Sequence, residues 1–250
     1  MASITEIAPD LYRISLYWTE IDLQFNHFLL KDEQPLLFTT GFRRTFPELK
    51  EAVRQIMDPA RLRWISFSHF ESDECGALNH WLATAPHAEP VCGFTGALVS
   101  ITDFADRPPR VLQDGETLAT GEYRLRFCST PHLPHGWDAG VLFEETHKTL
   151  LCSDLFHHNG QVEPITESDI LGRVRQAMHT MEAGPMPRYM PWTPYSGQLL
   201  EQLAQLRPQI FAVMHGSSFR GDGAQALRDL SVVMKEELGG RPEQKGISAA

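Results

Sequence analysis

The chain has 250 residues, of which 42% are hydrophobic, so it is long and apolar enough to bury a sizeable core. Its formal net charge of −10 argues against a surface for nucleic acid or for an anionic membrane, because both favour basic patches. We see no apolar run of membrane-spanning length and no secretory signal, and the four cysteines form no CxxC pair. We therefore expect a reduced, cytoplasmic setting.

The first half of the chain alternates apolar runs with turn residues and helical patterns. Strands are expected at 10–18, 25–32, 35–42, 63–68 and 89–94. Helices are expected at 45–59 and 76–86, and a short helix follows residue 94. Thr45 and Glu48 have the spacing of a capping box, and Pro47 lies in the first turn of that helix.

The second half repeats this organisation, with strands first and helices later. Strands are expected at 116–120, 123–130, 140–145, 149–154 and 209–216, and helices at 168–185, 195–208 and 222–238. Two such halves predict two sheets packed face to face with helices outside, which is an α+β, αββα four-layer sandwich. We expect a single domain over residues 1–238 and a mobile C-terminal tail at 239–250, where the sequence is polar and contains Gly and Pro.

Polar side chains gather at the carboxyl ends of four of these apolar strands. They are His69, Glu71, Asp73, His135, Asp154 and His215. If the strands lie side by side, their ends share one rim of the sandwich and the side chains can meet. Three imidazoles and three carboxylates exceed the needs of one tetrahedral zinc, and they suit two metals with one carboxylate bridging. Three hard oxygen donors favour iron or manganese, although they do not exclude zinc.

The segments HFESDE, HGWD, CSD and MHG resemble the metallo-β-lactamase superfamily, and within it the diiron branch. Hydrolases of that superfamily carry H-x-H-x-D-H in the first motif, whereas this chain has Glu71 at the second histidine. H-x-E-x-D is the mark of flavodiiron proteins and oxygen-binding diiron proteins. The later spacings are similar too: 61 residues separate Asp73 from His135, 18 separate His135 from Asp154, and 60 separate Asp154 from His215.

The resemblance implies a pair of iron ions with an oxo or hydroxo bridge. It implies that one iron is held by His69, Glu71 and His135, that the other is held by Asp73 and His215, and that Asp154 bridges them.

The chain departs from the family pattern in three ways. Glu74 stands where the motif usually has its last histidine, so the second iron gains a carboxylate, a water or an open position. Thr39 and Thr40 stand where an Asp-Thr pair is common. Only 35 residues follow His215, without a phosphate loop, so we expect no flavodoxin domain and a separate electron donor, either a flavoprotein or a rubredoxin.

Other residues are candidates for the pocket around the metals. The segment STPHLPHGWD offers two histidines, and we favour His135 over His132 as the ligand, which leaves His132 beside the ligands or at the pocket mouth. Glu74 and Tyr195 are further pocket candidates, the latter together with Trp192 as a wall. One of the two histidines at 157 and 158 is a candidate proton donor, although solvent exposure is the simpler interpretation. His27 lies in an apolar strand and is interpreted as a core histidine.

Two classes of function remain open. The first is a non-haem diiron protein that binds dioxygen or nitric oxide and either reduces it or senses it. The second is a metallo-hydrolase with two zinc or iron ions, against which Glu71 argues. Relatives in the superfamily are often homodimers, which suggests the same here. A purely structural metal site is disfavoured, because structural sites tend to be closed.

Overall fold

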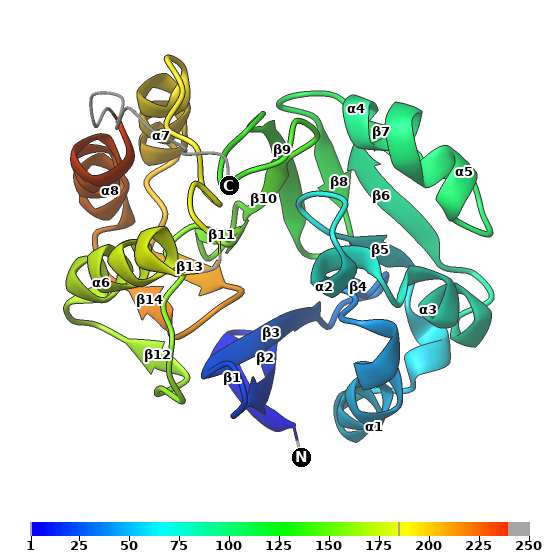
Figure 1. The fold of residues 1–250 in the computed structure, drawn as a ribbon. Helices are drawn as coiled ribbons and strands as arrows, with labels where there is room; N and C mark the ends of the chain where they lie inside the picture. The colour runs from blue at the N-terminus through cyan, green and yellow to red at the C-terminus, as the bar shows by residue number, and fades with distance from the viewer. Residues whose placement is uncertain (1, 185, 240–250) are drawn as a thin grey trace, which may run out of the picture.

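Two seven-stranded β-sheets, packed face to face and covered by helices on their outer faces, make up the described part of the chain (Figure 1). The structure is a computed structural model that describes residues 2–184 and 186–239. The layers are helices, sheet, sheet and helices, so the predicted αββα sandwich is confirmed. None of the helices in these residues combines the length and the apolar character that a membrane span requires.

The first sheet contains the first seven strands in chain order. They are β1 (Ser3–Ala8), β2 (Leu11–Trp18), β3 (Leu23–Leu30), β4 (Leu36–Phe38), β5 (Trp64–Ser66), β6 (Glu89–Gly93) and β7 (Arg110–Leu112). Strands β1 to β4 pair antiparallel and β4 to β7 pair parallel. The α-helices of this half are α1 (Phe46–Ile56), α2 (Ser72–Cys75), α3 (Leu78–Thr84), α4 (Phe94–Gly96) and α5 (Thr102–Phe104). Short 3-10 helices lie at Arg43–Thr45 and Pro59–Arg61, and a π-helical segment, Ala97–Ile101, joins α4 to α5.

The second sheet has the strand order β12-β14-β13-β11-β10-β9-β8. Its strands are β8 (Thr117–Ala119), β9 (Arg124–Ser129), β10 (Gly140–Glu144), β11 (Thr149–Ser153), β12 (Ile165–Thr166), β13 (Ile210–Val213) and β14 (Ser218–Arg220). Its outer face is covered by α6 (Ile170–Ala183), α7 (Ser196–Gln205) and α8 (Gly223–Leu238), on the left in Figure 1. Strands β11 and β13 pair parallel, so their carboxyl ends lie at the same edge.

Among the described residues, the three largest apolar clusters hold the four layers together. Strand β3 shows how the sequence supplies them, because successive side chains of a strand point to opposite faces. Phe28 lies in the cluster between the two sheets, and its neighbour Leu29 lies in the cluster between the first sheet and its helices. The third cluster joins the second sheet to α6, α7 and α8. Every residue of β3 is buried, and its polar residues Gln24, Asn26 and His27 have hydrogen-bond partners inside the protein.

Some local predictions differ from the structure. The strands β1, β7, β12 and β14 were not predicted; β7, β12 and β14 are only two or three residues long, and β1 carries alternating polar residues. The capping box is wrong, because Thr45 ends a short helical turn and its hydroxyl donates to the carbonyl oxygen of Phe42 at 2.9 Å. The predicted mobile tail lies outside the described residues from position 240 onward, as does Pro185, the expected end of α6.

The cluster between the sheets should carry much of the stability. Phe28 is fully buried there, and replacing a buried phenylalanine by alanine leaves a cavity. We expect Phe28→Ala to lower the free energy of unfolding by about 3–5 kcal/mol in urea titrations. The matched surface variant Val232→Ala, at a side chain that is 55% exposed, should change it by less than about 0.5 kcal/mol. Equal effects of the two variants would contradict this assignment of the core.

Candidate metal centre

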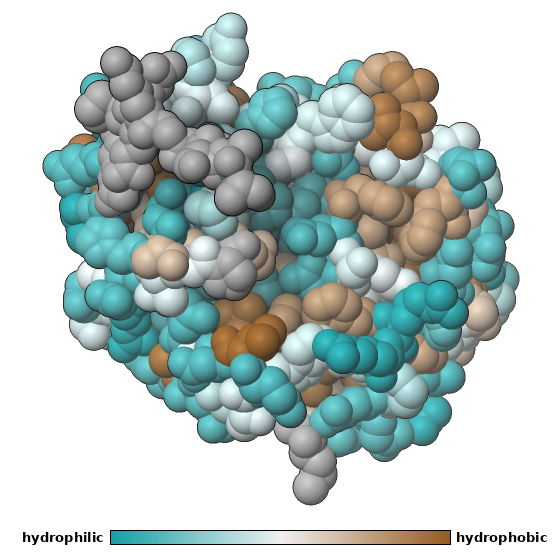
Figure 2. Space-filling view, in the orientation of Figure 1, coloured by the Kyte–Doolittle hydropathy of each residue, from teal (hydrophilic) through white to brown (hydrophobic). Residues whose placement is uncertain are grey.

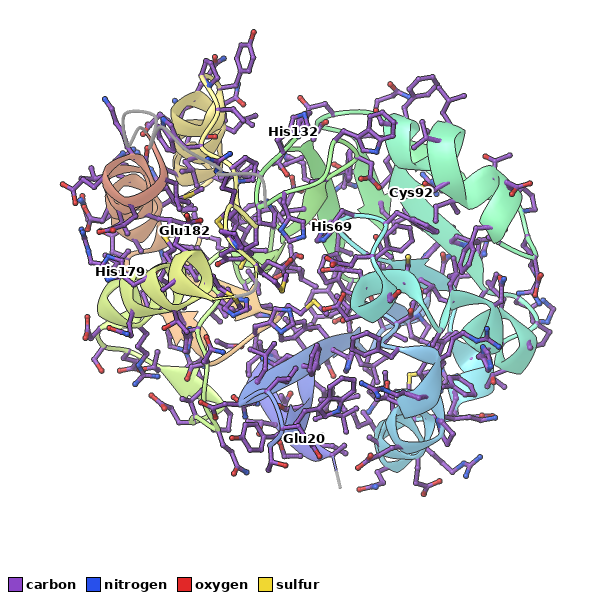
Figure 3. All side chains as sticks on the ribbon, viewed as in Figure 1. Glu20, His69, Cys92, His132, His179 and Glu182 are labelled. Carbon is purple, nitrogen blue, oxygen red and sulfur yellow. The ribbon has the colours of Figure 1, made fainter. Side chains whose placement is uncertain are left out.

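Four of the predicted site residues meet at the edge where the two sheets face each other. One ligand atom from each of His69, Glu71, His135 and Asp154 lies within 4.8 Å of those of the other three. His69 and Glu71 follow β5, His135 lies between β9 and β10, and Asp154 comes directly after β11. Figure 3 shows His69 near the middle of the molecule, between the two halves. The site is therefore built from both sheets.

Glu71 is the common partner of two imidazoles. Its Oε2 lies 3.0 Å from Nε2 of His69 and 3.0 Å from Nε2 of His135. The Oδ2 atom of Asp154 completes this group, at 3.6 Å from Nε2 of His69 and 3.4 Å from Nε2 of His135. Donors held at ~2.1 Å around one ion are roughly 3.0–3.4 Å apart in octahedral or tetrahedral geometry. These four side chains fit a metal ion.

The other oxygen of Asp154 faces a second group of residues. Its Oδ1 lies 3.1 Å from Nε2 of His215, and the same nitrogen lies 3.4 Å from Oδ2 of Asp73. One carboxylate thus presents one oxygen to each of two histidine groups. This is the arrangement that a carboxylate bridging two metal ions requires, so the donor set of the six residues fits a dinuclear centre.

The charges at the centre shift the pKa values of its groups. Burial alone would lower the pKa of His69, but the hydrogen bond with Glu71 and the nearby charges of Glu74 and Asp154 raise it to about 9. The bonds from His135 and His69 lower the pKa of Glu71 to about 2. The pKa of His215 is raised by its carboxylate neighbours and that of Asp154 is lowered by its histidine neighbours, in both cases against the effect of burial. The carboxylates and imidazoles of the centre thus stabilise each other's charged forms.

A buried polar network holds the turn after His215. The side-chain amide of Asn26 donates to the carbonyl oxygens of Val213 at 2.9 Å and of Gly216 at 2.8 Å, and the buried Arg13 donates to the latter at 3.0 Å. The N–H of Ser217 donates to Nε2 of His158 at 2.8 Å. Nδ1 of His215 faces the carbonyl oxygen of Gln24 at 2.9 Å, which directs Nε2 toward the carboxylates.

Glu74 is hydrogen-bonded to the protein through both of its carboxylate oxygens. Its carboxylate accepts a hydrogen bond from the N–H of Ser68 at 2.9 Å and another from the hydroxyl of Ser153. Burial raises its pKa to about 7, against the effect of His69. Ser153 has a positive φ of 52°, a strained conformation directly before Asp154. Glu74 thus ties together the two segments that lead into His69 and Asp154.

Other sequence candidates are placed differently from expectation. His132 is exposed and outside the cluster, its N–H donating to the carbonyl oxygen of Gly136, and Figure 3 shows it away from His69. Tyr195 is 69% exposed at the start of α7 and does not wall the site. The predicted exposure of His157 and His158 is wrong, because both are buried.

Tyr189 is an aromatic residue beside the centre that was not predicted from the sequence. Its ring centroid lies 6.4 Å from that of His135 and 5.7 Å from that of His157. It lies in the same Pro-containing loop as Trp192, and only its position in space distinguishes it from the neighbouring aromatic residues.

The centre opens to the surface beside Glu71. A hollow of about 460 Å³ is lined by His69, Phe70, Glu71, Ser100, His135, Gly136, Trp137 and Asp138. The side chain of Glu71 is 48% exposed there, whereas that of Asp73 is 13% exposed. Exposed apolar side chains border this mouth and continue over α4 and α5, where Figure 2 shows brown and tan residues at the upper right. They are Phe70, Phe94, Leu98, Val99, Phe104 and Trp137.

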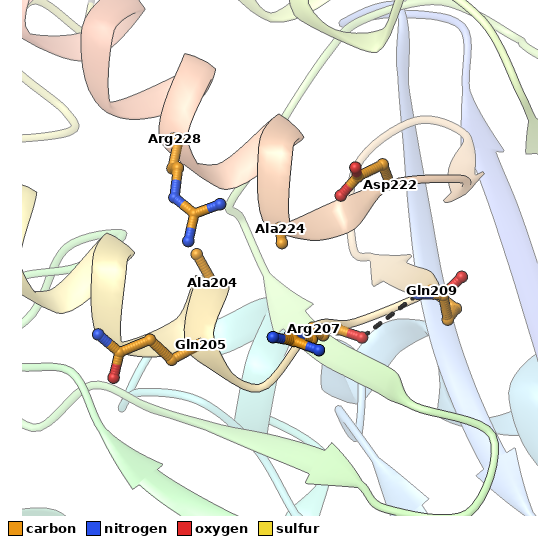
Figure 4. A pocket seen from close by; sticks show the side chains of 7 residues that line it. All are labelled: Ala204, Gln205, Arg207, Gln209, Asp222, Ala224 and Arg228. Atoms are coloured by element: carbon orange, nitrogen blue, oxygen red, sulfur yellow. Dashed lines mark hydrogen bonds between the residues drawn. The ribbon is translucent and has the colours of Figure 1, made fainter.

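A second hollow, of about 540 Å³, lies between the end of α7 and the start of α8 (Figure 4). It is lined by Ala204, Gln205, Arg207, Gln209, Asp222, Ala224 and Arg228, so it includes none of the candidate ligands. Arg228 is already paired with Glu201 at 2.9 and 3.0 Å. Of these two hollows, only the first is lined by candidate metal ligands.

Comparison with known proteins agrees with this fold. The sequence model described as ODP family beta lactamase matches residues 23–216. A rubredoxin-oxygen oxidoreductase of Megalodesulfovibrio gigas is 28% identical over 208 residues, covering 79% of this chain and 49% of the relative. A flavo-diiron protein of Clostridium acetobutylicum is 24% identical over 221 residues, covering 85% of this chain and 55% of the relative. The chain thus spans about half the length of these curated relatives.

Solved structures show the same architecture. The rubredoxin oxygen:oxidoreductase from Desulfovibrio gigas superposes with a TM-score of 0.81 at 23% identity, over 94% of this chain and 62% of that one. The flavodiiron protein from Giardia intestinalis superposes with a TM-score of 0.72 at 16% identity, over 94% of this chain and 59% of that one. At these identities the likeness concerns the fold.

The turn after His215 gives a test of how the site is held. Gly216 has a φ of +111°, and a Cβ there would lie 2.4 Å from Nε2 of His158. We expect Gly216→Ala to lower the free energy of unfolding by about 1–3 kcal/mol and to reduce the metal bound per chain, because His215 is displaced. Gly115→Ala is the control, with a φ of +77° and nothing within 4 Å of its Cβ. Urea titration and elemental analysis would contradict the expectation by showing equal metal content and stability for both.

The core histidine in β3 should make the metal-free protein sensitive to acid. His27 is fully buried, Nδ1 faces the hydroxyl of Thr39 at 3.0 Å, and burial lowers its pKa to about 3. The unfolded chain binds a proton at this residue below about pH 6.5 and the folded chain does not, so acid favours unfolding.

We therefore expect the stability of the wild type to fall more steeply than that of His27→Gln between pH 6.5 and 4.5. The difference in slope should approach roughly 1.4 kcal/mol per pH unit in urea titrations of metal-free protein. Parallel slopes for the two proteins would rule out a neutral His27 in the folded state.

Proposed function

The chain belongs to the family described as ODP family beta lactamase, and on that premise we propose that it is a non-haem diiron protein that binds and reduces dioxygen or nitric oxide. The observation that carries the proposal is Asp154, which turns one carboxylate oxygen to the His69 and His135 pair and the other to His215. Relatives named as rubredoxin-oxygen oxidoreductase and as anaerobic nitric oxide reductase flavorubredoxin support the choice of reaction.

In this proposal each iron has its own set of ligands and Asp154 is shared. The residues for the first iron are His69, Glu71 and His135, and those for the second are Asp73 and His215. Zinc or manganese are the alternative metals for the same donors. A pair of ferrous ions held here would supply electrons and open coordination positions for a diatomic ligand.

The protein's own residues orient the ligands and limit the access of water. The ring of Phe25 packs edge-on against His215, with centroids 5.1 Å apart, and restricts rotation of the imidazole. Tyr189 covers His135 and His157. Burial raises the pKa of Tyr189, so its phenol stays protonated near neutral pH and is the group we propose as a proton donor beside the site.

Electrons come in this proposal from a separate redox protein, either a flavoprotein or a rubredoxin. The exposed apolar side chains around the mouth support contact with another protein at this face, because large exposed apolar patches mark such contacts. The proposal also includes the homodimer and the cytoplasmic setting expected from the sequence, and light scattering tests the former.

Metal analysis and oxygen uptake together test the proposed function. We expect anaerobically purified protein to hold two irons per chain, and its reduced form to consume dioxygen or nitric oxide repeatedly while a reductant is supplied. Binding without repeated consumption would indicate a sensor in place of a reductase. Two tightly held zinc ions and no reaction with either gas would overturn the proposal in favour of the hydrolase.

Glu71 should set the choice of metal. Exchanging its hard oxygen donor for an imidazole in Glu71→His should shift binding from iron toward zinc when both are offered in equal amounts. Glu89→His, at a glutamate that pairs with Arg63 on the surface, is the control and should keep the wild-type ratio. An unchanged iron-to-zinc ratio in Glu71→His would contradict the role given to this carboxylate.

A further inference from the structure

The two halves of the proposed centre are unequal in the ligands assigned so far. The first ion has two imidazoles, His69 and His135, and the carboxylate of Glu71, whereas the second has only His215 and Asp73 beside the shared Asp154. Glu74, the residue that follows Asp73, does not supply the missing ligand. Both carboxylate oxygens of Glu74 are engaged by Ser68 and Ser153, as described above.

A buried imidazole lies beside His215 on a different segment. His157, three residues after Asp154, is 5% exposed, and its Nε2 is buried without a hydrogen-bond partner among the described residues. Its ring centroid lies 4.9 Å from that of His215, with the planes at 51°. A buried ring nitrogen without a partner is costly unless something binds it.

The spacing of these two rings is somewhat wider than that of the first pair. The centroids of His69 and His135, which share Glu71, lie 4.3 Å apart. Two imidazoles bound to one ion at ~2.1 Å place their centroids roughly 4.6–5.3 Å apart when the bonds meet at 90 to 110°. The pair formed by His157 and His215 has this separation.

We propose that His157 is a ligand of the second metal ion through Nε2, and that it supplies the imidazole missing from the first motif. The inference rests on the proposed function, because it needs two ions at the centre. Each ion is then held by two imidazoles and one carboxylate, with Asp154 between them. Glu74 is a positioning residue, which acts through Ser153 on the segment carrying Asp154.

The neighbouring Asn159 offers the competing interpretation. Its side chain is close enough to His157 to influence that histidine, so a hydrogen bond between the two side chains is the alternative to a metal bond. The replacements His157→Gln and His157→Asp separate these cases. Glutamine keeps a polar side chain that can bond to Asn159 but is a poor ligand, whereas aspartate is a metal ligand.

The test counts metal ions and follows the coupling between them. After anaerobic loading and gel filtration, we expect about two irons per chain in the wild type, about one in His157→Gln, and a return toward two in His157→Asp. The electron paramagnetic resonance signal of the half-reduced iron pair should disappear in His157→Gln and return in His157→Asp. His27→Gln is the matched control: it removes a histidine that is equally buried, and it should keep both irons.

Two irons and the wild-type signal in His157→Gln would overturn the inference while leaving the proposed function intact. If that variant does not fold, pulsed resonance on wild-type protein with ¹⁵N-labelled histidine decides instead, since four coordinated histidine nitrogens support the inference and three contradict it. If the wild type holds two zinc ions, the proposed function fails. The number of zinc ions bound per chain by His157→Gln still tests whether His157 is a metal ligand. A wild type with a single metal ion overturns both.

Discussion

A buried carboxylate that faces three imidazoles is the contact on which the rest of the structure depends. Asp154 is almost inaccessible, and a charge in such a place is stable only when opposite charge or hydrogen-bond donors surround it. His69, His135 and His215 provide that surrounding from three different segments. The loops that carry them are in turn fixed by buried polar side chains, so the protein's own hydrogen bonds set the positions of these imidazoles.

The packing of the two sheets and the chemistry of the centre are linked. The first sheet supplies His69, Glu71 and Asp73, and the second supplies His135, Asp154 and His215. The apolar cluster between the sheets therefore sets the distance between two halves of one site. Glu74 adds a polar link across the same boundary, because it follows the first sheet and binds Ser153 of the second.

Most of the architecture could be predicted, because apolar runs with turn residues between them define long buried strands such as β2 and β3. Strands of two or three residues, such as β12, carry too little pattern to be recognised. The six ligand candidates were found because each follows an apolar strand, and polar residues there are unexpected. Tyr189 and the buried state of His157 could not be predicted, since both depend on how the loops after β11 and α6 fold back over the edge. The role of Glu74 could not be predicted either, because it depends on a hydrogen bond from Ser153, which is distant in sequence.

The carboxylates of Glu71 and Asp73 are unequally exposed, which gives the centre an outer and an inner side. Glu71 borders the mouth and Asp73 lies deeper, as their side-chain exposures of 48% and 13% show. If the proposed pair of ions is present, a chelating agent entering from solvent would meet the outer ion first. Protein purified with such agents would then retain the inner ion alone. The number of metal ions per chain would therefore depend on how the protein was purified as well as on the affinity of the site.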